Sequence, residues 1–248
     1  MTALSINLNK IALIRNSREG NYPNIIEMAE QCINLGADGI TVHPRPDQRH
    51  IRPSDVRQLA SLVNPISAVE FNIEGNPFAE PLADYPGLLA LVEETQPDQC
   101  TLVPDSNHQL TSDHGFDLKA QGIELEPIIQ QIKSLSVRVS LFMDPDLEQI
   151  KLASAVGADR IELYTGPYAA AWGTDALEGI FQQHVAAANL AETLGLGVNA
   201  GHDLNLHNLG KFAGIENLLE VSIGHAFTVD SINMGMPSAI SAYKALLA

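Results

Sequence analysis

The sequence has little of what secreted, membrane-spanning or nucleic-acid-binding proteins need. Its only two cysteines, Cys32 and Cys100, fall in a helical and a strand pattern, which is typical of buried thiols rather than of a disulfide or zinc site. No apolar run reaches the roughly 18 residues of a transmembrane helix, and no charged start precedes an apolar stretch, so we expect a cytoplasmic protein. Cations are scarce: 14 Lys and Arg stand against 30 Asp and Glu, and the net charge of −16 argues against nucleic acid or an anionic membrane surface as partners.

What is present is an unbroken alternation of strand and helix patterns. Short apolar, β-branched runs predict strands at 4–9, 39–42, 67–73, 99–103, 138–142, 160–163, 197–200 and 219–223. Two of the intervening helices end in related phrases, GADGI at 36–40 and GADRI at 157–161, in which a glycine stops the helix. Eight such units with near-continuous apolar strands, in 248 residues, predict one domain over 1–248, an α/β protein with the (β/α)8 TIM barrel fold.

Titratable side chains gather where the predicted strands end. His43, Glu74, Glu162, His202 and His225 each follow an apolar run. The carboxyl ends of parallel strands open onto one face, where barrel enzymes place their active sites. Histidine exchanges protons near neutral pH, and burial shifts the pKa of a glutamate upward toward that range. This pattern favours general acid/base catalysis.

Three connections that follow strands are longer than a stable barrel requires. They span 75–86, 104–117 and 164–175, and the last contains the single tryptophan, Trp172. Long loops in compact domains are commonly functional, so we expect them to overhang the catalytic face as lids.

The cations are concentrated near the start of the chain. Seven of the fourteen are Lys10, Arg15, Arg18, Arg45, Arg49, Arg52 and Arg57. Arg18 after strand 1, and Arg45, Arg49 and His50 after strand 2, are placed to bind phosphate, whereas we expect Arg52 and Arg57 to lie on a solvated helix start.

A second anion site is predicted after strands 7 and 8. These strands end in Gly201-His202 and Gly224-His225. Barrels often bind phosphate through backbone N–H groups in these two loops, where glycine permits close approach. Two anion sites on one face imply one bisphosphate or two phosphorylated substrates.

Other reaction classes compete with this interpretation. A metal hydrolase needs converging ligands, often a His-x-His pair, but strand 1 has Asn7-Leu8-Asn9 there, which weakens the metal-dependent alternative. Lys10 would be the Schiff-base residue of an aldolase-like enzyme, and a barrel that only binds phosphorylated metabolites is a further alternative. The sequence has no nucleophile elbow, GxGxxG phrase or P-loop.

Longer phrases along the whole chain resemble one family. INLNKIALIRNSREG, GADGITVHPRPDQRHI, EFNIEGNP, TLVPD, RIELYTGPYA, VNAGHDL and VSIGHA, in this order, are similar to the pyridoxine 5′-phosphate synthases of deoxyxylulose-dependent vitamin B6 biosynthesis. The resemblance implies a (β/α)8 barrel that assembles as a homo-octamer and uses no cofactor. It also implies condensation of 1-deoxy-D-xylulose 5-phosphate with 3-amino-2-oxopropyl phosphate, which releases phosphate and water.

The resemblance assigns roles to individual residues. His43 and Glu74 would accept protons, His202 would donate one, and Glu162 would stabilise developing charge. Deoxyxylulose phosphate would be held by Asn9, Lys10, Arg45, His50 and Thr111. The aminoketone phosphate would be held by Asn7, Arg18, Asp203, Gly224 and His225.

The chain departs from the commoner family pattern at two places. Asn9-Lys10 stands where Asp-His is usual, which alters the contact to deoxyxylulose phosphate because Asn is uncharged and Lys is a long cation. Asp203 replaces a glycine that often follows the catalytic histidine, and its negative charge disfavours a nearby phosphate unless the side chain turns away.

Overall fold

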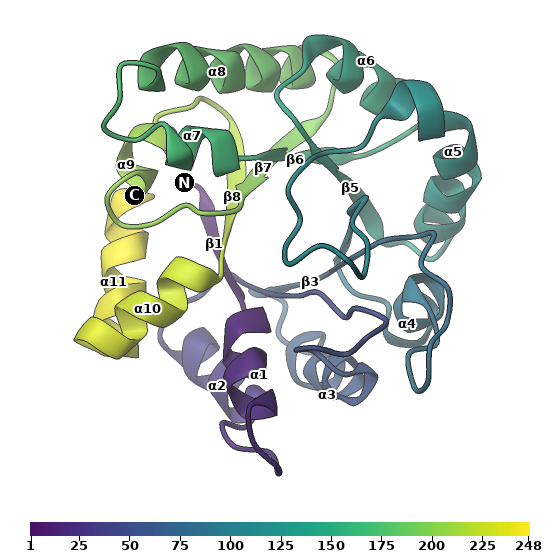
Figure 1. Cartoon of the computed structure of the whole chain (residues 1–248), viewed down its shortest axis with the longest axis vertical. Helices are drawn as coiled ribbons and strands as arrows, with labels where there is room; N and C mark the ends of the chain where they lie inside the picture. The colour runs from purple at the N-terminus through teal and green to yellow at the C-terminus, as the bar shows by residue number, and fades with distance from the viewer.

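Eight parallel strands close into a barrel in the computed structural model, which describes residues 1–248 (Figure 1). Each strand pairs with its neighbours in sequence, and β1 closes the barrel against β8. The strands are β1 (Ala3–Asn7), β2 (Gly39–Val42), β3 (Glu70–Gly75), β4 (Gln99–Leu102), β5 (Arg138–Met143), β6 (Arg160–Tyr164), β7 (Gly197–Gly201) and β8 (Leu218–Ile223). The predicted TIM barrel is confirmed.

Helices surround the barrel and cover the apolar outer face of its strands (Figure 1). They are α1 (Asn9–Asn16), α2 (Ile25–Asn34), α3 (Pro53–Val63), α4 (Leu88–Thr95), α5 (Leu118–Ser134), α6 (Leu147–Ala155), α7 (Gly166–Ala170), α8 (Leu177–Thr193), α9 (Leu209–Phe212), α10 (His225–Met234) and α11 (Met236–Leu246). Every one of them is too short or too polar to cross a lipid bilayer. Cys32 of α2 and Cys100 of β4 are free and buried, as predicted.

The repeated GAD phrase ends a helix and begins a strand at two places. Gly36 and Gly157 follow α2 and α6 with φ of +99° and +88°, a left-handed conformation that glycine adopts without the steric cost of a Cβ atom. The aspartate that follows each of them has a second task, which the sequence pattern did not reveal. Asp38, Asp98 and Asp159 precede β2, β4 and β6, and their carboxylates accept the N–H groups of Leu4, Phe71 and Val139, near the start of the preceding strand.

Two predicted strands differ from the structure by more than one residue, and one predicted loop contains a helix. The strand expected at 4–9 ends at Asn7, because the Asn7 side chain accepts the N–H of Asn9 at 3.0 Å and the chain turns into α1. The strand expected at 67–73 begins at Glu70, since a turn closed by the Val69 N–H and the Ile66 carbonyl precedes it. The predicted loop 164–175 contains the short helix α7.

The barrel interior is polar, so the prediction of near-continuous apolar strands was wrong. Apolar side chains of the strands pack against the helices, and several of the alternate, polar side chains bond to one another, as Ser5 does to Thr41 at 2.7 Å and Thr101 to Asn72 at 3.1 Å. Asn199 of β7 donates to Gln99 of β4 at 3.3 Å across the barrel. Arg160 Nη1 lies 3.1 Å from the Asn199 side-chain oxygen and 3.6 Å from a carboxylate oxygen of Glu220. The interior therefore carries charge directly beneath the face onto which the strands open.

Candidate active site

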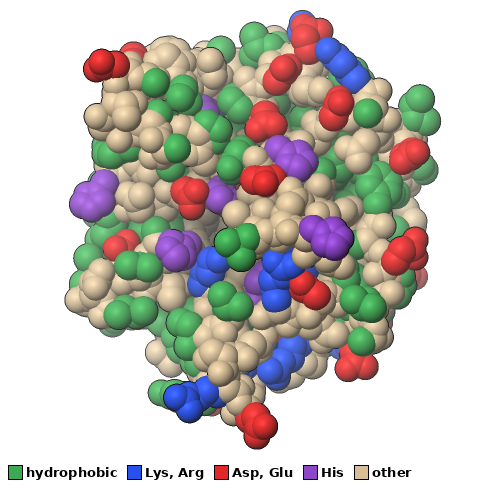
Figure 2. Space-filling model, viewed as in Figure 1, with side chains coloured by type: hydrophobic (Ala, Val, Ile, Leu, Met, Phe, Trp, Pro, Cys, Tyr) green, Lys and Arg blue, Asp and Glu red, His purple; other side chains and the backbone are tan.

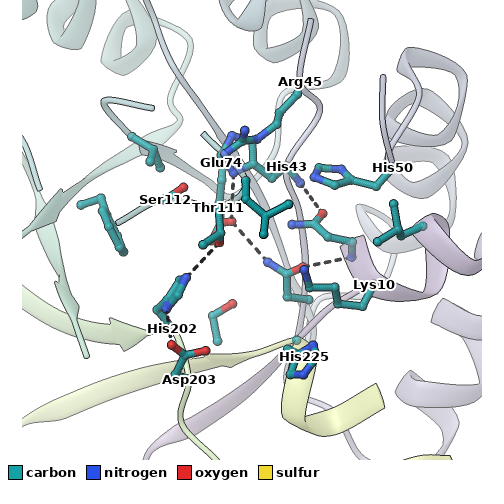
Figure 3. A pocket seen from close by; sticks show the side chains of 18 of the residues that line it. Lys10, His43, Arg45, His50, Glu74, Thr111, Ser112, His202, Asp203 and His225 are labelled. Carbon is teal, nitrogen blue, oxygen red and sulfur yellow. Dashed lines mark hydrogen bonds and ion pairs between the residues drawn. The ribbon is translucent and has the colours of Figure 1, made fainter. Parts of the chain in front are cut away.

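A cavity of about 380 Å³ lies at the carboxyl ends of the strands (Figure 3). All predicted site residues except Arg18 line it. They are Asn7, Asn9, Lys10, His43, Arg45, His50, Glu74, Thr111, Glu162, His202, Asp203, Gly224 and His225. The five residues that the strand-end rule identified, His43, Glu74, Glu162, His202 and His225, are far apart in sequence and share this cavity with residues that the family resemblance indicated.

The cations near the start of the chain serve different purposes. Arg18 is exposed after the end of α1 and does not line the cavity. Arg15 is fully buried and pairs with Asp55 at 2.6 Å, so it joins α1 to α3 and is not available to bind an anion. Arg57 is exposed on α3, as expected.

His43 lies buried between two carboxyl groups. Its Nδ1 is 3.7 Å from Oε2 of Glu74, and its Nε2 is 3.2 Å from Oδ2 of Asp105. Burial, together with the smaller effect of the nearby positive charges of Arg45 and Arg49, lowers the pKa of His43 to about 3. The imidazole is therefore neutral at physiological pH and keeps a lone pair that can accept a proton.

Two glutamates face the cavity from the barrel interior. Burial, together with the smaller effect of the charge of Glu220, raises the pKa of Glu162 to about 8, so this carboxyl favours the protonated form at neutral pH. Burial and the neighbouring Glu162 also raise the pKa of Glu74, while a 3.3 Å hydrogen bond donated by Asn7 opposes the shift. A protonated carboxyl can donate a proton or a hydrogen bond.

The Asn9-Lys10 pair lies in the first turn of α1. Asn9 accepts the backbone N–H of His43 at 2.9 Å through its side-chain oxygen, so this residue holds the β2 end in place. Lys10 lines the cavity between His50 and His225 in the view of Figure 3. Its positive charge helps to lower the pKa of Asp203, after the larger effect of His202.

His202 is held on the opposite side of the cavity. Its Nε2 lies 2.9 Å from the Thr111 hydroxyl, and its ring packs edge-on against Tyr164 with centroids 5.2 Å apart. Its Nδ1 is 3.0 Å from Oδ2 of Asp203, in a direction that does not make a hydrogen bond. Both His202 and Asp203 have positive φ, +87° and +58°. Glycine adopts such a conformation without the steric cost of a Cβ atom, which explains why it suits position 203.

The loop 104–117 is tied to the cations that follow β2. Arg45 binds the Asp105 carboxylate and donates to the Gln109 carbonyl at 2.9 Å, and Arg49 donates to the Gln109 and Asn107 carbonyls, each at 2.7 Å. Lys, Arg and His side chains gather near the middle of this face of the molecule (Figure 2). The cavity thus combines proton-transfer groups with a cluster of cations inside an acidic protein.

Some residues of the site were not predicted. Those that line the cavity include Leu13, Val103, Leu110, Ser112, Phe142, Leu204, Ser222 and Ala226. Phe142 and Ser222 lie near the ends of predicted strands, so the same rule applied to every residue type would have found them. No group of three or more His, Cys, Asp or Glu side chains is arranged to hold a metal ion.

Sequence comparison identifies relatives over the full length of the chain. The family model described as "Pyridoxal phosphate biosynthesis protein PdxJ" matches residues 4–248. Pyridoxine 5′-phosphate synthase of Xanthomonas campestris pv. campestris (strain B100) is 53% identical over 248 residues, which cover 100% of this chain and 96% of the relative. The enzyme of the same name from Xylella fastidiosa (strain M23) is 51% identical over 99% of this chain and 95% of its own.

Solved structures share the fold at much lower identity. 3-Hexulose-6-phosphate synthase from Salmonella typhimurium has a TM-score of 0.64 and 14% identity, covering 99% of this chain and 98% of its own. KGPDC from Streptococcus mutans has a TM-score of 0.63 and 10% identity, covering 100% and 97%. At these identities the likeness concerns the barrel alone.

Proposed function

Because the chain belongs to the PdxJ family of pyridoxal phosphate biosynthesis proteins, we propose that it condenses 1-deoxy-D-xylulose 5-phosphate with 3-amino-2-oxopropyl phosphate. The products are pyridoxine 5′-phosphate, inorganic phosphate and water. The observation that carries this proposal is the neutral, buried imidazole of His43, which shares one cavity with His202 and two glutamates. A ring-closing condensation needs several proton transfers at different positions, and one group could not serve them all.

The first part of the reaction joins the two substrates. The amine nitrogen attacks the ketone carbon of deoxyxylulose phosphate, and the resulting hydroxyl leaves as water once it is protonated. Glu162 favours its protonated form at neutral pH and stabilises the charge that develops in this step. His202 donates a proton from the opposite side of the cavity.

The second part closes the ring. A proton is removed from the carbon next to the imine, water and then phosphate are eliminated from the deoxyxylulose part, and a water molecule adds to the carbon that the phosphate leaves. A new carbon–carbon bond to the ketone carbon of the aminoketone part, followed by loss of water, completes the pyridine ring, so the aminoketone phosphate becomes the 5′-phosphate of the product. His43 accepts the proton that is removed from the carbon next to the imine. Glu74, whose Oε2 lies 3.7 Å from Nδ1 of His43, donates its own proton to the departing hydroxyl and then, as a carboxylate, accepts the proton from His43.

The two phosphates are held on opposite sides of the cavity. Arg45, His50 and Thr111 bind the phosphate of deoxyxylulose phosphate, and Asn9 and Lys10 contact the same substrate. Asn7, His225 and the backbone N–H groups of Asp203 and Gly224 bind the aminoketone phosphate. Arg18 lies outside the cavity, so no contact with either phosphate is proposed for it. We further expect a cytoplasmic homo-octamer that needs no cofactor, and light scattering of the purified protein would measure its mass.

The first experiment follows product formation by the purified wild-type protein after treatment with a chelator. It is supplied with deoxyxylulose phosphate and freshly generated 3-amino-2-oxopropyl phosphate, and pyridoxine phosphate is measured by mass together with released phosphate. Equal amounts of the two products are expected. Binding of both substrates without any product would contradict the proposal and favour a barrel that only binds phosphorylated metabolites.

A further inference from the structure

Asp105 is a buried carboxylate at the active site that the sequence analysis did not select. It follows β4 in the loop 104–117 and is 5% exposed. It lines a second cavity of about 350 Å³, which shares His43 and Arg45 with the main cavity. The carboxylate therefore stands directly behind two residues to which the proposed reaction assigns roles.

Contacts from several segments hold this carboxylate in one orientation. Its Oδ2 atom accepts hydrogen bonds from the Arg45 guanidinium and, at 3.3 Å, from the Ser112 hydroxyl. The backbone carbonyl of Asp105 accepts a 2.5 Å hydrogen bond from Asn76 in the loop after β3. Burial raises the pKa of Asp105, but the contact with Arg45 favours the ionised form. An ionised carboxylate can only accept hydrogen bonds.

The position of this acceptor bears on which nitrogen of His43 carries the proton. The Nε2 atom faces Oδ2 of Asp105 at 3.2 Å, whereas Nδ1 faces Glu74 at 3.7 Å. A neutral imidazole carries one N–H. Which of the two ring nitrogens carries it depends on the hydrogen-bond partners that the protein places beside them. A proton on Nε2 lies on the side of the fixed carboxylate, whose Oδ2 is 3.2 Å from that nitrogen, and leaves the lone pair of Nδ1 on the side of Glu74.

We propose that Asp105 is a positioning residue, which holds His43 as the Nε2–H tautomer so that Nδ1 is the atom that accepts protons in the reaction. The inference rests on the proposed function, because it assigns the atom through which His43 would act. A carboxylate that orients a catalytic histidine affects turnover more than substrate binding. A purely structural role, in which Asp105 only holds Arg45, would instead weaken the binding of deoxyxylulose phosphate.

The direct test is the ¹⁵N NMR spectrum of wild-type protein labelled at histidine, with the His43 signals assigned from His43→Ala. The Nε2–H tautomer is expected in the wild-type protein. Asp105→Asn keeps the shape of the side chain but can present an N–H to Nε2, so it should populate the other tautomer. A wild-type spectrum with the proton on Nδ1 would overturn the inference, whether or not any variant folds.

Kinetics give a second, independent readout. Asp105→Asn should reduce kcat by about tenfold or more while KM for deoxyxylulose phosphate changes by less than about threefold. Asp105→Glu, which restores the charge, should recover part of kcat. The matched control is Asp47→Asn, since Asp47 pairs with Arg49 at 2.6 Å without contacting His43.

Three kinetic results would count against the positioning role. They are an unchanged kcat in Asp105→Asn, an effect confined to KM, or an equal loss in the Asp47 control. A wild-type protein that forms no product would refute the proposed function, and the tautomer measured by NMR would still decide whether Asp105 orients His43.

Discussion

A histidine with a carboxyl group near each ring nitrogen would ordinarily become more basic, yet burial keeps His43 neutral. Its pKa falls to about 3 because the protonated form would have to be desolvated beside Arg45. The same burial raises the pKa of Glu162 to about 8. The site therefore holds a neutral base and protonated acids at the same pH, which is the distribution that repeated dehydration requires.

Replacing His43 tests whether its neutral imidazole is the proton acceptor of the site. His43→Ala should reduce kcat by about 10²–10⁴-fold, since it removes the proton acceptor, and should leave the binding of deoxyxylulose phosphate almost unchanged. Steady-state kinetics and titration calorimetry measure the two effects separately. The matched control is His207→Ala, at an exposed position outside the cavity. Full activity of His43→Ala would move the acid/base assignment to another residue.

The sequence predicted the site residues at strand ends better than those in loops. Glu74 and Glu162 were recognisable because a charged residue at the end of an apolar run is unusual. Asp105 was missed because a loop imposes no periodicity on side-chain direction, so its approach to His43 depends on long-range contacts. Arg18 was predicted from its charge, its place after the first strand and the family resemblance, but it lies after the end of α1 and does not line the cavity.

At the scale of elements, one buried ion pair fixes the first helix of the chain. Arg15 of α1 makes two hydrogen bonds of 2.6 and 2.9 Å to the Asp55 carboxylate of α3 and donates a third to the His50 carbonyl at 2.9 Å. Asp55 also accepts the N–H of Arg52 at the start of α3. This contact positions the helix that carries Asn9 and Lys10 against the segment that carries His50.

Breaking this pair should cost much stability. Asp55→Ala leaves the Arg15 guanidinium buried without its partner, so the free energy of unfolding should fall by about 3–5 kcal/mol in denaturant titrations. Arg57→Ala, which removes the exposed pair with Glu94, should change it by less than about 1 kcal/mol. Similar losses of stability in the two variants would show that the buried Arg15–Asp55 pair contributes no more to the free energy of unfolding than the exposed Arg57–Glu94 pair.

Element types were predictable because strand and helix periodicities differ, whereas some boundaries depended on single side chains. The Asn7 side chain ends β1 two residues earlier than the apolar pattern suggested. The GAD phrase was recognised as a helix stop from its glycine. The use of its aspartate on a neighbouring strand could not be predicted, because that contact joins residues 34 positions apart.

At the scale of the whole molecule, the polar interior of the barrel contains buried acidic groups. Burial raises the pKa of Glu220 to about 7 and that of Glu162 to about 8, whereas an unfolded chain restores both to about 4.3. Between those values the folded protein binds more protons than the unfolded chain. The stability that these groups contribute is present in full below about pH 4.3 and is lost as the pH rises through the folded pKa values.

The free energy of unfolding should therefore decrease between about pH 6.5 and 8. The lowered pKa of His43 makes the free energy of unfolding rise with pH, but only up to about pH 6.5, so it does not act in this window. Glu162→Gln should flatten the decrease, by up to about 1 kcal/mol per pH unit, because it removes one titrating group. Denaturant titrations at several pH values measure the slope, with Glu124→Gln on the exposed face of α5 as control. An unchanged slope in Glu162→Gln would contradict the assignment.

The contacts of the Asp38 carboxylate bear on the order in which the chain folds during synthesis. It accepts the N–H of Leu4 in β1 and pairs with Lys244 of α11 at 2.7 Å, so three segments meet at one side chain. Thr2 likewise donates to the Leu218 carbonyl at the start of β8. β1 thus depends on contacts from β8 and α11, segments that are translated much later than β1 itself, and the barrel can close only after these segments have left the ribosome.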